Sequence, residues 1–417
     1  MNQLPIQPDV GTSGPEGVSW RVCRSRLAAT LNVVPSQVWA AALLAFSLSA
    51  IMHANTSIPN YYSDFNAFYG RPEIQALGIP YMDFQFEYPP LSGLILYTSM
   101  ITSQMKSPTI WYVTYLAWLA VFTMLLAYGS CRLCELTGAN KNRVVTRVFL
   151  TGSMIGYLVY NFDIILVALL TLSLCAFMVN RTRLSALFLG LGVVTKLFPI
   201  MLLPIFMQQL RTRRERLIYP LIVAATMSCF YLPIAALSFD ALWRMLTLTF
   251  EGGPENTWLV FFLDYPPFTM MRYVGIAIWL LALAHALTAK NRSMVERAYM
   301  MTGGFLLGSW VFTPQMALWL LPLLACLNTL PQIAFTIFDL SNAAMMLFFF
   351  QFSNQFSASS PIQWINLIRV GVLAVSLAPY FTGKSLRALL AWLRAPLVSS
   401  TALGSDKSSR SHSDRME

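Results

Sequence analysis

Acidic and aromatic side chains are concentrated in one polar interval, residues 60–91, which follows the first long apolar run. Its acids are Asp64, Glu73, Asp83 and Glu87, and its rings include Tyr61, Tyr62, Phe65, Phe68, Tyr69, Tyr81, Phe84 and Phe86. Ordinary connections between membrane helices are short, whereas aromatic side chains settle at the membrane–water interface. The interval is therefore predicted to fold as a cap on the bilayer surface, with its acids at the mouth of an intramembrane cavity.

Asp64 is the first of these acids and a candidate general base. A carboxylate can take a proton from a hydroxyl group that is held close to it. The alternative is a helix cap or a surface acid. Asp83 and Glu87 lie four residues apart, but Pro80, Pro89 and Pro90 predict an irregular segment. These two acids could position a sugar through its hydroxyl groups or bind a cation. Two acids alone do not predict a metal site.

Lys196 interrupts residues 184–208, which are otherwise apolar apart from Ser, Thr and Gln, and Pro199 follows it. Lysine often extends its amine to a nearby interface, but neither end of this segment is close. A cation in a membrane cavity needs an anion, and a lipid-linked phosphate would supply one. Arg244, in a later loop, is a candidate second phosphate ligand, or a solvated arginine.

Tyr88 and Trp258 have a structural interpretation first. Tyr88 precedes Pro89-Pro90, which fix the direction of the chain as it enters the bilayer, and tryptophan anchors at the interface. Aromatic faces also stack on sugars, so a functional role for Trp258 remains open.

The composition assigns the chain to the membrane. Of its 417 residues 56% are hydrophobic and 11% charged, less than half the charged fraction of about 25% that is usual in soluble domains. Apolar runs of about 20 residues predict an all-α, polytopic transmembrane bundle of about 12 crossings with a folded first extracytoplasmic loop. The net charge of +10 comes from short connections and tails, so no nucleic-acid partner is expected.

The basic connections predict the orientation. Residues 132–147, 211–216 and 290–297 should be cytosolic, and the loops 60–88 and 238–267 extracytoplasmic. With the cytosolic end of residues 132–147 fixed, one of the segments 89–104 and 108–132 should be re-entrant.

Three regions are expected: a cytosolic tail (1–36), one membrane domain (37–383), and a second cytosolic tail (384–417) that is disordered at its end. The hairpins 148–160/164–179 and 184–195/199–209 have arms too short to cross a core of about 30 Å, which places Asp163 and Lys196 in the outer half of the membrane. The Cys131–Cys134 pair is interpreted as reduced, cytosol-facing thiols without a metal.

Four stretches in order carry a resemblance to a known family. They are the first loop from Ser63-Asp64-Phe65 to Tyr88-Pro89-Pro90-Leu91, the turn Asn161-Phe162-Asp163, the hairpin from Gly190 through Thr195-Lys196-Leu197-Phe198-Pro199, and Thr313-Pro314-Gln315 with Trp319. Together they resemble the GT-C superfamily, most closely glycosyltransferase family 87, which contains polyprenol-phosphate-mannose-dependent α-mannosyltransferases of bacterial cell envelopes.

The resemblance implies an inverting transfer of a sugar, mannose in the first instance, from a polyprenyl-phosphate donor to a lipid- or glycan-linked acceptor at the outer membrane face. Asp64 would be the base. The residues themselves place Lys196 and Arg244 at the phosphate, and no cofactor and no metal-binding residues are expected, with the metal requirement left open. The expected substrate-positioning residues are Asp83, Glu87, Tyr88, Asp163, Glu251, Trp258 and Gln315. Two alternatives stay open: a flippase or transporter of lipid-linked sugar, and an O-antigen-type ligase.

Overall fold

The computed structural model describes residues 33–54, 62–263, 268–327, 330–352 and 354–383. All regular elements in these ranges are helical, apart from two isolated backbone bridges. Most of the predicted N-terminal tail, the whole C-terminal tail, and Tyr61 lie outside the described residues. In chain order the elements are α2 (Ser36–Ala54), α3 (Asp64–Tyr69), α4 (Pro72–Gln75), α5 (Pro90–Ser103), α6 (Pro108–Thr137), α7 (Asn142–Val144), η2 (Val145–Phe149), α8 (Gly152–Tyr157), α9 (Asp163–Met178), α10 (Thr182–Val193), η3 (Phe198–Leu202), α11 (Leu203–Gln209), α12 (Arg213–Leu237), α13 (Phe239–Glu251), α14 (Val260–Leu263), α15 (Thr269–Thr288), α16 (Met294–Gly308), η4 (Pro314–Leu320), α17 (Leu321–Cys326), α18 (Gln332–Phe348), η5 (Phe349–Gln351) and α19 (Pro361–Thr382).

Long apolar helices make this a multi-pass membrane protein. Among the described residues, six spans are long and apolar enough to cross a bilayer: α2, α6, α12, α15, α18 continued by η5, and α19. Shorter apolar helices such as α9 and α10 pack among them. The all-helical membrane fold is thus confirmed, whereas the count of about 12 crossings and the re-entrant segment stay predictions.

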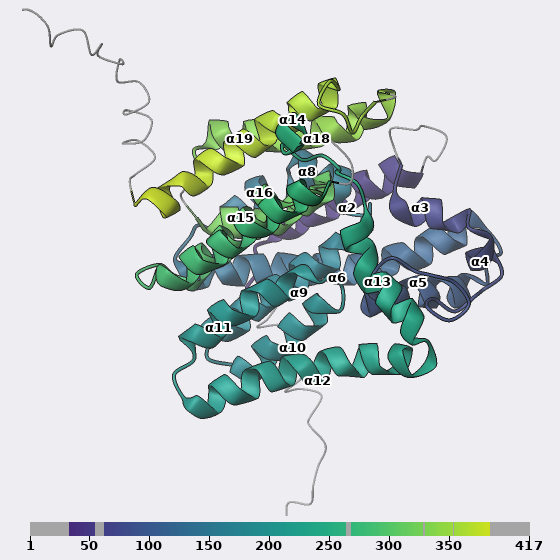
Figure 1. The fold of residues 1–417 in the computed structure, drawn as a ribbon, viewed down its shortest axis with the longest axis horizontal. Helices are drawn as coiled ribbons and strands as arrows, with labels where there is room; N and C mark the ends of the chain where they lie inside the picture. The colour runs from purple at the N-terminus through teal and green to yellow at the C-terminus, as the bar shows by residue number, and fades with distance from the viewer. Residues whose placement is uncertain (1–32, 55–61, 264–267, 328–329, 353, 384–417) are drawn as a thin grey trace, which may run out of the picture.

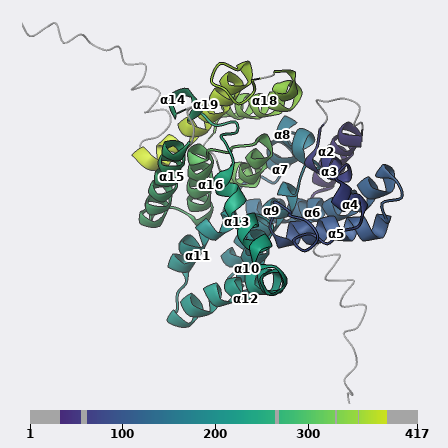
Figure 2. The same cartoon turned by 45° about the vertical axis from the view of Figure 1, so that its right-hand side comes forward.

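Helix α9 lies at the centre of one half of the molecule, between α6 and α10, with α12 outside α10 (Figure 1). Its residues from Asp163 to Ala176 are all buried. The other half contains α15, α16, α18 and α19, with η4 and α16 joining it to α9 (Figure 2). The start of α9 and the end of α10 are therefore buried inside the protein, whereas the connection from the end of α9 to the start of α10 is exposed.

Small residues set the distance between α15 and α16. A Cβ atom on Gly275 would lie 2.3 Å from the carbonyl oxygen of Gly308, and one on Gly304 would lie 2.3 Å from the Cβ of Ala282. Such contacts let the two backbones approach closely, as is common where helices associate within a membrane.

Two predicted segments differ in detail. Residues 148–160 do not form one helical arm, because the chain breaks after η2 at Leu150 and restarts as α8, where Thr151 caps the new helix. The loop 238–267 contains α13 and α14, since Ser238 caps an amphipathic sequence there. The first loop holds α3 and α4 and then an irregular segment before α5, as predicted.

Several arginines at the end of the bundle opposite α3 bind backbone carbonyls. Arg143 and Arg147 donate to the carbonyls of Leu324, Leu327 and Leu330, around the end of α17. Arg297 donates to the carbonyl of Ala289 after α15. These basic side chains satisfy carbonyls that a helix end leaves free, in addition to any effect on orientation.

The paired cysteines do not face solvent. Cys131 and Cys134 are buried on α6, and the Cys134 thiol lies 3.6 Å from that of Cys326. Both are free thiols, and the described residues hold no group of three or more His, Cys, Asp or Glu side chains able to bind a metal. The expectation of cytosol-facing thiols is wrong for this pair, because α6 buries that face against α17.

Candidate active site

Asp64 is positioned by the first turn of α3. Ser63 caps this helix by accepting from the Asn66 amide, and the ring of Phe65 stacks against Trp111 and Tyr115 of α6. Because Phe65 anchors one face of α3 on α6, the preceding carboxylate is directed toward the neighbouring turns.

The Asp64 carboxylate is held by neutral donors. The Tyr88 hydroxyl donates to its Oδ2 at 2.9 Å, and the Asn161 amide donates to the same oxygen at 2.6 Å. The Asn161 amide also donates to the Tyr88 hydroxyl at 2.7 Å. One carboxylate oxygen is thus committed to a closed hydrogen-bond triangle, and the Tyr62 hydroxyl is a further hydrogen-bond partner of the carboxylate.

Partial burial makes Asp64 a stronger base than an ordinary aspartate. Loss of solvent raises the pKa of Asp64 to about 6, against the opposing effects of the Tyr88 hydrogen bond and the Lys196 charge. At neutral pH the group is still ionised. Asp64 is therefore in the form that can accept a proton, and its pKa is closer to neutral pH than that of an ordinary aspartate.

Lys196 occupies the turn after α10 and is paired with an acid. Its amine lies 2.8 Å from Oδ2 of Asp163, with side-chain exposures of 15% and 0%. The indole of Trp319 donates to the other oxygen of Asp163 at 2.6 Å. The amine also lies 5.6 Å from the ring centre of Tyr88 and 5.9 Å from that of Trp319. This pair explains how a cation is retained at an otherwise apolar position.

The sequence from residue 161 to residue 163 joins the two parts of the site. Asn161 binds Asp64, while Asp163, the first residue of α9, binds Lys196. A second connection joins the start of α5 to the residues that follow α10. The Leu91 amide donates to the Val194 carbonyl at 2.8 Å, and the Ser92 hydroxyl donates to the Thr195 carbonyl at 3.0 Å. Base and cation are thus held in a fixed register.

A further acid, Glu255, lies in the second loop, within range of the charge of Asp64. Its backbone bonds to Trp310 and Phe312, and Arg369 of α19 secures this contact by donating to the carbonyl of Phe312 at 2.7 Å. Burial raises the pKa of Glu255 to about 7, and the charge of Asp64 adds to the effect. At neutral pH Glu255 is therefore partly protonated.

The other acids of the first loop lie apart from Asp64. Asp83 is exposed and accepts from the Ile79 amide at 2.7 Å, a local turn contact. Glu87 binds Arg71 through both carboxylate oxygens, and the two side chains are about one-third exposed. The roles of Asp83 and Glu87 in positioning a substrate stay predictions. Glu87 is the stronger candidate, because it immediately precedes Tyr88, which binds Asp64.

Of the later candidates, Arg244 and Glu251 are exposed on α13. The Trp258 indole donates to the carbonyl of Leu307 at 2.6 Å, which agrees with its structural interpretation. Gln315 is buried in η4, four residues before Trp319. Among these four, Gln315 lies on the element that carries the indole bound to Asp163.

Sequence reasoning gave no role to Asn161, Trp319 or Glu255. Nothing in the sequence distinguishes Glu255 from the exposed Glu251, because only the backbone contact with residues 310–312 brings it inward. Asn161 could have been found from its position two residues before Asp163, in a turn between apolar segments.

Neither the models of known protein families nor the curated proteins compared with this chain match it.

Proposed function

We propose that this protein is a membrane glycosyltransferase that moves a sugar from a polyprenyl-phosphate donor to a hydroxyl group of a lipid- or glycan-linked acceptor. The observation that carries the proposal is the junction at residues 161–163, which holds a carboxylate base and a partly buried cation in one assembly. A base for the acceptor and a cation for the departing phosphate are the two charges such a transfer needs.

In the proposed reaction Asp64 takes the proton of the acceptor hydroxyl on a carboxylate oxygen. The acceptor oxygen forms a bond to the anomeric carbon, and the bond from that carbon to the phosphate oxygen breaks. Polyprenyl phosphate leaves with the bonding electron pair on its phosphate oxygen. Attack from the side opposite the phosphate inverts the anomeric centre, so a β-linked donor gives an α-linked product.

Lys196 is proposed to stabilise the leaving phosphate. An ammonium group has three N–H donors, and Asp163 uses one of them, so the others remain for phosphate oxygens. Asp163 and Trp319 keep the amine in place before the donor arrives, which lowers the cost of ordering it during the reaction. Arg244, which is exposed on α13, is proposed as a second phosphate ligand.

The test is sugar transfer by purified protein in detergent. The donor is synthetic polyprenyl-phosphate mannose, the acceptor a glycolipid extract of the native membrane, and the readout labelled sugar in the product. Asp64→Asn keeps the shape of the side chain but accepts no proton, so the rate should fall about 10²- to 10⁴-fold. Glu73→Gln is the matched control, because this exposed acid of the same loop has no role in the proposed reaction.

Two results would count against the proposal. If Asp64→Asn transfers sugar at a near-native rate, Asp64 is not the base. If reconstituted wild-type protein moves the lipid-linked sugar across vesicles without forming a product, it is a transporter of that lipid instead.

A further inference from the structure

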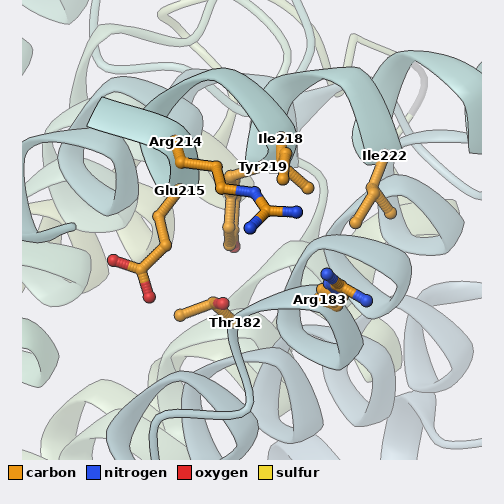
Figure 3. A pocket seen from close by; sticks show the side chains of 7 residues that line it. All are labelled: Thr182, Arg183, Arg214, Glu215, Ile218, Tyr219 and Ile222. Atoms are coloured by element: carbon orange, nitrogen blue, oxygen red, sulfur yellow. The ribbon is translucent and has the colours of Figure 1, made fainter. Parts of the chain in front are cut away.

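A cavity opens between α10 and α12 at the end of the bundle opposite Asp64. Its volume is about 190 Å³, and it is lined by Thr182, Arg183, Arg214, Glu215, Ile218, Tyr219 and Ile222. Figure 3 shows Arg214 extending from α12 toward the end of α10 that carries Thr182 and Arg183, with the Glu215 carboxylate turned away from both arginines. The proposed transfer reaction uses none of these residues.

Both arginines of the cavity are free to bind an anion. Arg183 and Arg214 are exposed, and neither makes a hydrogen bond or ion pair with a described residue. Glu215, the acid in the lining, is already committed, since its Oε2 accepts from the amide and hydroxyl groups of Thr212 at 3.1 and 3.0 Å. Two guanidinium groups without a local carboxylate partner favour a phosphate group, which they can bind through paired N–H donors.

The apolar residues next to the two arginines indicate which class of phosphate compound the cavity would bind. Ile218 and Ile222 continue the cavity along α12, next to the exposed apolar side chains of Leu217 and Leu221 on the same helix. Leu184 and Leu187 are exposed on α10. A basic pocket that leads into an apolar helix face suits a molecule with a charged headgroup and acyl chains, whereas inorganic phosphate would use the arginines alone.

We propose that this cavity binds the headgroup of an anionic phospholipid, with Arg183 and Arg214 on the phosphate and an acyl chain along Ile218 and Ile222. The basic connections predict that this end lies at the cytosolic leaflet, which is rich in anionic lipid. The lipid would hold α10 and α12 together at the end opposite Lys196.

The experiment compares lipid binding by three forms of the full-length protein in detergent. Native mass spectrometry measures retained phosphatidylglycerol, with phosphatidylcholine as the neutral lipid. Arg183→Gln with Arg214→Gln removes the proposed ligands. Arg181→Gln with Arg213→Gln is the matched control, because it removes the same charge from exposed arginines at the same two helix ends that do not line the cavity.

The wild type and the control should retain one phosphatidylglycerol molecule more tightly than phosphatidylcholine. The Arg183/Arg214 variant should bind it roughly tenfold more weakly or worse, since each basic side chain near an anionic lipid contributes on the order of fivefold. Equal losses in the two double variants would overturn the site. Complete competition by millimolar inorganic phosphate would overturn the assignment to a lipid. Size-exclusion profiles verify that all three proteins are folded.

Discussion

The raised pKa of Asp64 has a consequence for stability as well as for catalysis. The folded protein binds the proton at a pH where the unfolded chain has released it, since the pKa is about 6 when folded and 3.8 otherwise. The free energy of unfolding should therefore fall as the pH rises from about 4 to about 6. Above this range the ionised group costs the folded state on the order of 1–3 kcal/mol.

Asp64→Asn should accordingly melt at a higher temperature than the wild type at pH 7.5, with the difference shrinking toward pH 4.5. Thermal unfolding in detergent at several pH values measures this gap. A gap for Asp64→Asn that is independent of pH would contradict the raised pKa.

Lys196→Ala should lower the rate of transfer about 10²- to 10³-fold, the usual effect of removing one preorganised group that stabilises charge. It also leaves Asp163 buried without its cation, so a loss of stability is expected. Lys196→Arg restores a cation and should recover part of the rate, because its shape and hydration differ. Steady-state kinetics with varied donor concentration separates donor binding from turnover. Unchanged donor dependence in Lys196→Ala would exclude the phosphate role.

At the scale of elements, the contact between α15 and α16 depends on the absence of side chains. Gly275→Ala would place a methyl group 2.3 Å from the Gly308 carbonyl oxygen, so the helices must separate. We expect a loss of about 1–3 kcal/mol, typical of overpacking, seen as a lower melting temperature. Gly371→Ala on α19 is the control, since a methyl group there meets no atom within 4 Å. Equal melting temperatures for Gly275→Ala and the wild type would show that α15 and α16 can accommodate a methyl group at this contact.

At the scale of elements, only part of the candidate site could be predicted from the sequence. Lys196 stands out because an isolated cation in an apolar hairpin is rare, and Asp64 because it begins a polar interval rich in rings. Their meeting depends on Asn161 and Asp163, whose spacing is visible in the sequence but whose partners are not. Glu255 and Arg369 were missed because their importance comes from contacts between distant segments, which no local pattern encodes.

For the whole molecule, the prediction concerns sidedness. Gln75 and Gly253 are exposed at the Asp64 end, and Thr212 is exposed at the opposite end. In a background with Cys23 and the exposed Cys229 replaced, Cys substitutions at the first two positions should react with a membrane-impermeant thiol reagent in intact cells. A Cys at 212 should react only after permeabilisation. Labelling of 212 alone would reverse the orientation and place the Asp64 end in the cytosol.

The burial of α9 affects how the protein responds to membranes of different thickness. A helix exposed to lipid must match the thickness of the hydrocarbon core or else tilt or deform the bilayer around it. From Asp163 to Ala176 the residues of α9 are buried against other parts of the protein, so this helix of 16 residues, about 24 Å long, needs no such match. Because Asp163 begins this helix, the depth of the ion pair is set by the surrounding helices. A change in bilayer thickness would act first on the outer spans, such as α12 and α15, and reach Lys196 only through them.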